Sequence, residues 1–279
     1  MISPPGLMLK RPGILIPVFF LSLLHLQATC QWPWPETGSA ALGGCYITGH
    51  GFSCAGQNQA GLGFIERSSF TMQHCRPYLL KEIGISTLSA QLKAGTGALG
   101  VSVASRGIKG FRQTSMWFSY GMKLYPGISA GVGIHLWNSA IPEQIIYAPG
   151  ISFALGLQIR INDHWILGGG LFHPAGWYSQ SAFSIQQSMA IETGFSYTFL
   201  HSGHLYSEFN LQPGKGIILC NGLDWTTHQH TIFRTGFSTR PYAFSWGISR
   251  EFRGWVMEFS FQYRIDSGVA PLTSITYAW

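Results

Sequence analysis

Charged side chains are scarce in this chain of 279 residues. Only 10% of the residues are Asp, Glu, Lys or Arg, against roughly a quarter in ordinary soluble domains. Aromatic residues make up 14% of the chain, and 35 residues are glycine. A soluble β-protein needs charged residues to coat its outer surface, and this sequence has too few of them. The composition therefore disfavours an ordinary soluble domain.

The N-terminus has the layout of a secretory signal peptide. Lys10 and Arg11 precede an apolar run at 14–24, and a short polar stretch with small residues ends at Cys30. We expect residues 1–30 to be removed after Cys30, an arrangement that resembles exported proteins of Bacteroidota. The alternative is cleavage before Cys30 and attachment of a lipid to this cysteine.

Several other signals are missing. Beyond the signal peptide no uninterrupted run of eighteen apolar residues occurs, which argues against a membrane-spanning helix. The remaining net charge, 15 − 11 = +4, is too small to indicate nucleic-acid binding. The ten histidines form no ligand set with metal-binding spacing, and no catalytic motif surrounds pairs such as Asp163 and His164. We expect no metal, no other cofactor, no nucleic-acid partner and no enzymatic activity.

Four cysteines follow the signal peptide. Three of them are close enough in sequence to form one disulfide in an oxidising periplasm, and a bond between Cys45 and Cys54 would close the shortest loop. The alternative is that these residues stay reduced. For Cys220 we expect a small apolar side chain in a strand.

An apolar residue at every second position is the main pattern of the later chain. In 255–265 the aromatic and aliphatic residues, Phe259 and Phe261 among them, share one face of a strand, while Glu258 and Arg264 lie on the other. Such segments predict about fourteen strands, at 64–75, 81–94, 97–106, 112–125, 127–138, 145–160, 163–172, 184–200, 203–212, 216–226, 229–240, 242–251, 254–266 and 271–279.

We interpret these strands as an all-β fold, a transmembrane antiparallel β-barrel in 64–279 whose apolar face contacts lipid and whose Gly- and Ser-rich face lines the lumen. The alternative is a soluble sandwich or lipocalin-like barrel, which the shortage of charge disfavours. The turns at one end of the barrel are short, which predicts that this end and both chain termini are periplasmic. The longest loop is expected after the seventh strand, around 173–180.

The last strand ends the chain on an aromatic residue. Ile275, Tyr277 and Trp279 share one face of this strand, and a terminal strand of this kind resembles the signal by which bacterial outer-membrane barrels are recognised and inserted. It would also close the barrel against the first strand, so that no strand edge faces lipid. We expect the protein in the outer membrane of a Gram-negative bacterium.

Basic residues fall near the expected outer ends of the strands. Lipopolysaccharide phosphates would bind cations there, and solvated loop charge is the alternative. These residues are Lys81, Arg106, Lys109, Arg112 and Lys215.

Residues 31–63 neither alternate nor follow a helical period. They contain Ala41-Leu-Gly-Gly-Cys-Tyr46 and, further on, Asn58-Gln-Ala-Gly-Leu62, and these two motifs resemble the opening pattern of FadL-like barrels and of the PorV/PorQ group associated with type IX secretion. Gln59 stands where the family usually has proline, and Cys45 stands where it has alanine.

The resemblance implies that this segment is a hatch inside the barrel. The alternative is a periplasmic extension. The hatch motif would consist of Gly43, Gly44, Asn58, Gln59, Ala60, Gly61 and Leu62.

The same resemblance implies two functions, both without catalysis. One is a PorV/PorQ-like interaction component that binds secretion-machine or cargo proteins during protein secretion or surface-protein handling. The other is a FadL-like channel for passive uptake of a hydrophobic small molecule. Small side chains on the inward faces favour the first, and outer-membrane lipid and lipopolysaccharide are expected partners of both.

Overall fold

The computed structural model describes residues 36–49, 54–108, 110–141, 146–178, 188–200, 202–214, 216–227 and 230–279. All of them belong to one compact unit, Pro33–Trp279. The signal peptide expected at 1–30 lies outside the described residues. Within the described part of the chain, no helix is both long enough and apolar enough to cross a bilayer.

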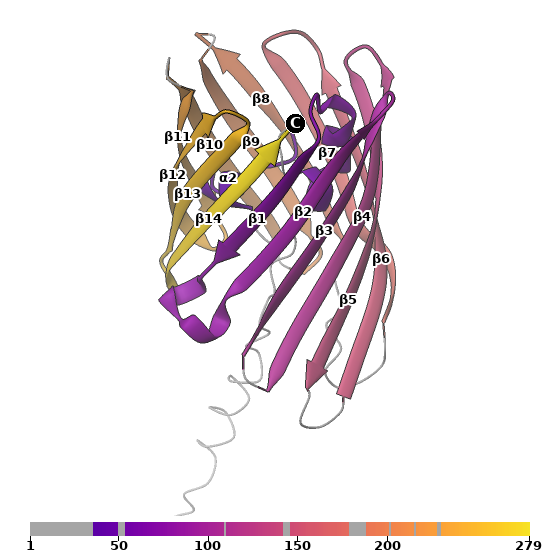
Figure 1. Cartoon of the computed structure of the whole chain (residues 1–279), viewed down its shortest axis with the longest axis vertical. Helices are drawn as coiled ribbons and strands as arrows, with labels where there is room; N and C mark the ends of the chain where they lie inside the picture. The colour runs from indigo at the N-terminus through magenta and orange to yellow at the C-terminus, as the bar shows by residue number, and fades with distance from the viewer. Residues whose placement is uncertain are drawn as a thin grey trace, which may run out of the picture. The chain divides into compact units, whose positions relative to one another are not determined.

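Fourteen antiparallel strands form a closed barrel (Figure 1). Each strand pairs with its neighbours in the sequence, and β1 pairs with β14 to close the ring. The strands are β1 (Ser69–Cys75), β2 (Ile85–Ala94), β3 (Gly97–Ile108), β4 (Phe111–Tyr125), β5 (Ile128–Ile141), β6 (Ile146–Arg160), β7 (Trp165–Tyr178), β8 (Ala190–Phe199), β9 (Gly203–Gln212), β10 (Gly216–Thr226), β11 (Thr231–Thr239), β12 (Tyr242–Phe252), β13 (Trp255–Arg264) and β14 (Gly268–Ala278). The predicted fold class and strand number are confirmed.

Short helices precede and interrupt the strand ladder. These are α2 (Thr37–Ala41), η1 (Cys54–Gly56), η2 (Gln59–Phe64), η3 (Pro77–Leu79) and η4 (Lys81–Ile83). The first strand begins at Ser69, later than predicted, because residues up to Phe64 form η2. A long connection follows β7 as predicted, but the predicted start at 173 is wrong, because β7 continues to Tyr178 and β8 begins at Ala190.

The outer surface of the barrel is apolar and the inner face is polar. Phe118 and Phe259 are 44% and 37% exposed on the outside. Glu258 faces inward, where its Oε1 lies 2.8 Å from Nη1 of Arg234. Most fully buried wall residues are serine, threonine, glutamine or glycine, the reverse of a soluble barrel. The alternating pattern therefore specified the correct face, and the structure is that of a transmembrane barrel.

The last strand closes the barrel as its sequence suggested. Ile275 pairs with Met72 and Tyr277 with Phe70 on β1, and the backbones of Trp279 and Ser68 exchange two hydrogen bonds of 3.0 and 3.1 Å. Ile275, Tyr277 and Trp279 are all exposed on the outer surface. The closure leaves no free edge between β1 and β14, whereas the role of these residues as an insertion signal stays a prediction.

The two ends of the barrel differ in the length of their connections. At the end where β14 finishes, the turns are short, for example Gly95-Thr96 and Pro126-Gly127. The opposite end carries the long connections 76–84 and 179–189. Single-chain barrels have short periplasmic turns and longer outer loops, so we refer to these ends as periplasmic and outer.

Candidate functional site

The chain that precedes β1 crosses the lumen of the barrel. We call residues 36–49 and 54–64 the lumen segment; Figure 1 shows its helix α2 within the ring of strands. Its polar contacts reach several walls. The backbone N of Thr37 donates to Oε1 of Gln73 on β1 (2.8 Å), and that of Ile47 donates to Oε1 of Glu208 on β9 (2.6 Å). Oγ of Ser129 on β5 donates to a carbonyl of the segment (2.6 Å).

Inward-facing glycines in the strands make room for this segment. A Cβ added to Gly121 or to Gly131, which pair with each other across β4 and β5, would overlap the backbone of Gln59. A side chain at these positions would therefore displace the segment. The wall glycines that approach the lumen segment in this way are Gly100, Gly121, Gly131, Gly133, Gly156, Gly168, Gly170, Gly194, Gly222, Gly236 and Gly247.

Five of the predicted hatch residues form one buried turn. Asn58 caps η2, since its Oδ1 accepts from the backbone N of Ala60 (3.1 Å). Nε2 of the fully buried Gln59 donates to the carbonyl of Gln57 (2.8 Å). Leu62 packs against Ala98 on β3, and Gly61 has no room for a side chain because a Cβ there would lie only 2.6 Å from Sγ of Cys54.

Gly43 and Gly44 end α2 on a different side of the lumen. Both have positive φ, +72° and +99°, the left-handed conformation that favours glycine after a helix. The backbone N of Gly44 donates to the carbonyl of Ser39 (2.8 Å). Gly43 lies against the backbone of Phe237 and Asn221, which belong to β11 and β10. The structure thus places the two halves of the predicted motif against different walls.

The candidate disulfide between Cys45 and Cys54 is not formed. Sγ of Cys54 donates to the carbonyl of Gly49 (3.6 Å) and packs in the cluster with Leu62. Cys45 lies instead near Glu208 and Cys220; burial, with a smaller contribution from these two groups, raises the pKa of its thiol. The fold separates the two cysteines by carrying the chain to different contacts, which sequence spacing could not show.

Aromatic rings and histidines gather on the inward faces of β4, β5 and β7. The rings of Trp117 and His135 stack with 4.5 Å between their centroids, and Trp137 lies 5.0 Å from His135. His173 is 5.4 Å from His135, and its Nδ1 is 2.6 Å from Oγ of Ser152. Trp117 and His135 lie at inward positions of the alternating pattern, but the pattern by itself did not reveal this cluster. Their direct cross-strand pairing was the signal that could have revealed it.

The pairing between β6 and β7 is irregular beside this cluster. Phe172 pairs with Ala154 and Gly176 with Ser152, so β7 has two more residues than β6 between these pairs. Pro174 lies in this bulge and has no N–H to donate to a ladder. Among the described residues, the ladder between β7 and β8 ends at Phe172, and the rest of β7 pairs with β6 alone.

A cavity of about 420 Å³ lies between the lumen segment and the inner faces of β9 to β13. Its lining is mixed, with Leu42, Ile232 and Val256 beside charged side chains. The Arg234–Glu258 ion pair lies here, and the hydroxyl of Tyr206 donates to Oδ2 of Asp224 (3.0 Å). Tyr46 also lines it, and burial raises the pKa of this phenol, helped by nearby Glu192. This compartment therefore offers both charged groups and apolar surface.

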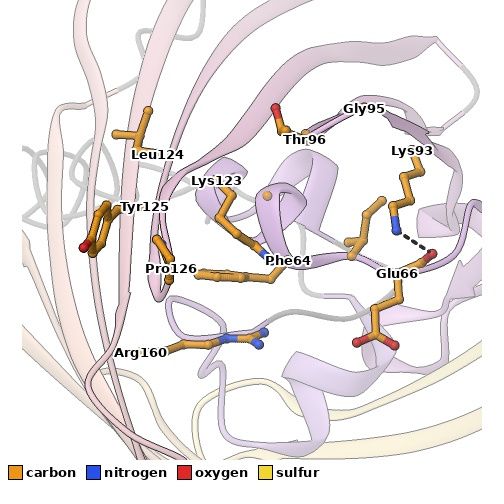
Figure 2. A pocket seen from close by; sticks show the side chains of 13 residues that line it. Phe64, Glu66, Lys93, Gly95, Thr96, Lys123, Leu124, Tyr125, Pro126 and Arg160 are labelled. Atoms are coloured by element: carbon orange, nitrogen blue, oxygen red, sulfur yellow. Dashed lines mark hydrogen bonds between the residues drawn. The ribbon is translucent and has the colours of Figure 1, made fainter.

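A second cavity, of about 710 Å³, opens at the periplasmic end; we call it the mouth cavity (Figure 2). The end of the lumen segment, the turns after β2 and β4 and the last residue of β6 line it. Its cations are Lys93, Lys123 and Arg160. In Figure 2 the ring of Phe64 lies between Lys123 and Arg160.

Only some of the basic residues expected at the outer end lie close together. Arg106 and Arg112 line a cavity of about 380 Å³ together with Ser86 and Ser105. Lys81 lies in η4 of the β1–β2 connection at the same end. Lys109 and Lys215 are outside the described residues. Binding of lipopolysaccharide at this end stays a prediction.

No family model matches the sequence, and a search of curated proteins found no match. Solved structures match the fold over most of the chain. The "CymD monoaromatic hydrocarbon channel" has a TM-score of 0.66 at 15% identity, covering 87% of this chain and 96% of that one. The toluene transporter TbuX of Ralstonia pickettii has a TM-score of 0.63 at 12% identity, with 87% and 97% covered. A FadL homologue of Pseudomonas aeruginosa has a TM-score of 0.61 at 12% identity, with 88% and 98% covered. At these identities the likeness shows the fold.

Proposed function

We propose that this protein is a FadL-like outer-membrane channel for the passive uptake of hydrophobic molecules. Its fold is that of barrels described as hydrocarbon channels and transporters. The lumen segment meets the walls from β1 to β12, and we expect it to obstruct a straight path through the barrel. A molecule that enters this lumen would then leave through the wall.

The observation that carries this proposal is the bulge in β7. It lies where the β7–β8 ladder ends, and its His173 contacts the rings of Trp117 and His135 inside the lumen. Large aromatic surfaces are the usual lining of sites for apolar ligands. An apolar molecule held at this cluster would be next to the part of the wall where, among the described residues, β7 pairs with β6 alone.

Removal of the bulge tests the proposal. Deletion of His173 and Pro174 removes the two extra residues of β7 and should allow regular pairing with β6 and continued pairing with β8. Uptake of toluene into lipid vesicles containing the full chain should then fall, while heat-modifiable gel mobility stays that of a folded barrel. Pro174→Ala keeps the chain length and serves as the matched control. Undiminished toluene uptake by the folded deletion variant would overturn the proposed exit.

The secretion role implied by the PorV/PorQ resemblance has less support. The matching structures named above are hydrocarbon channels, a toluene transporter and a FadL homologue, not secretion components. The aromatic cluster also differs from the inward face of small side chains on which the preference for a secretion component rested. The channel, which was the alternative, therefore becomes the leading function.

A further inference from the structure

Three cations lie at equivalent places in the periplasmic ends of alternate strands. Lys93, Lys123 and Arg160 lie on the inward faces of β2, β4 and β6, at or within two residues of the strand ends. The neighbouring outward position, Leu92 or Leu124, is apolar and exposed. The strand register therefore gathers three positive charges at the mouth cavity.

The end of the lumen segment holds two of these cations in place. The ring of Phe64 is buried, with the Cζ of Arg160 3.9 Å from its centroid and the Nζ of Lys123 at 5.5 Å. Such cation–π contacts restrict long side chains at a modest energetic gain. Lys93 is positioned by a hydrogen bond from its Nζ to the carbonyl of Glu66 (3.2 Å), drawn in Figure 2.

The remaining lining of the mouth cavity is of two kinds. Among the described lining residues, Glu66 supplies the one carboxylate, so three cations face one anion. Ile65, Leu124, Tyr125 and Pro126 supply apolar surface beside them. The volume of about 710 Å³ lies within the range of roughly 300–1,000 Å³ that is common for small-molecule sites.

We propose that the mouth cavity binds an amphipathic organic anion, a carboxylate or phosphate group on a compact apolar body. The anionic group would accept hydrogen bonds from Lys123 and Arg160, which are strong because both partners are charged. The apolar body would lie against Tyr125 and Pro126. This goes beyond the proposed channel, because a neutral hydrocarbon gains nothing from three cations.

Equilibrium dialysis of the full chain in a neutral detergent tests this site. The probes are 2-naphthoate, 2-naphthyl phosphate and the uncharged 2-naphthalenemethanol, each corrected for binding to empty micelles. We expect both anions to bind at least about tenfold more tightly than the alcohol, the factor that one charged hydrogen bond typically supplies. In 0.5 M NaCl the difference in affinity between the anions and the alcohol should decrease, because salt screens the charges. This measurement needs no variant.

The double variant K123Q/R160Q should lose the advantage of the anions. Arg253→Gln is the matched control, because Arg253 also lies over an aromatic ring, Phe252 (5.1 Å), in a periplasmic turn but does not line the mouth cavity. It should bind the anions like the unchanged protein.

Three results would overturn the proposal. The first is equal binding of naphthoate and the alcohol, and the second is that the folded double variant still binds the anions more tightly than the alcohol by the same factor. The third is full displacement of naphthoate by an equal concentration of inorganic phosphate, which would show that the apolar body contributes nothing. Dialysis measures binding without transport, so this site and the proposed exit at β7 can fail separately.

Discussion

The fit between the lumen segment and the barrel wall can be tested by adding one methyl group to a wall glycine. In Gly131→Ala the new Cβ would overlap the backbone of Gln59, which is fully buried. Neither group has room to move, because Gly121 on the neighbouring strand meets the same backbone. Overpacking of a filled interior typically costs about 1–3 kcal/mol. The shift would also strain the 2.6 Å hydrogen bond from Ser129 to the carbonyl of Ala60, a contribution of about 0.5–1.5 kcal/mol.

A glycine on the outer face provides the matched control. The Cβ of Gly169→Ala would have only the carbonyl of Glu192 as a neighbour, at 3.9 Å. Alanine there should be neutral or stabilise by up to about 1 kcal/mol, because glycine loses more conformational freedom in a strand. The two variants should therefore change stability in opposite directions.

Urea unfolding in lipid vesicles, followed by tryptophan fluorescence, measures this difference. We expect Gly131→Ala to lower the free energy of unfolding by roughly 1–4 kcal/mol, and to raise vesicle permeability to small solutes if the segment is displaced from its seat. Equal stabilities of Gly131→Ala, Gly169→Ala and the unchanged protein would refute the view that the wall glycines fit the lumen segment.

Two further predictions concern the barrel itself. Phe259→Arg places a charge on the lipid-facing surface and should cost about 2–4 kcal/mol, whereas His204→Arg, which lines the lumen cavity with Asp224 and Glu258, should cost much less; comparable folding of both into vesicles would contradict the assignment of faces. Deletion of Trp279 should reduce outer-membrane insertion without changing export to the periplasm, because the signal peptide and the closing strand serve separate steps. Cell fractionation with heat-modifiable gel mobility measures both, and a normal barrel yield would count against an insertion signal in the last strand.

The sequence by itself determined the barrel. Strand geometry turns successive side chains to opposite faces, so the alternation around Phe259 and Glu258 is a local property that survives in the fold. The low charge then decided which face meets lipid. Strand ends were harder to predict where helix or bulge geometry intervened, as at Phe64 and in β7 after Phe172.

The content of the lumen was decided by the tertiary structure. Gly121 and Gly131 could be recognised as inward-facing from their strands, but only the register brings them opposite each other and against Gln59. Cys45 and Cys54 are near in sequence, yet the lumen segment carries them to separate contacts.

The same holds for the mouth cavity. Lys93, Lys123 and Arg160 come from three separate strands and meet there because the barrel closes around Phe64. Period-two patterning records which way a side chain points. Which inward residues meet depends on the register between neighbouring strands and on the closure of the barrel, where β1 pairs with the distant β14.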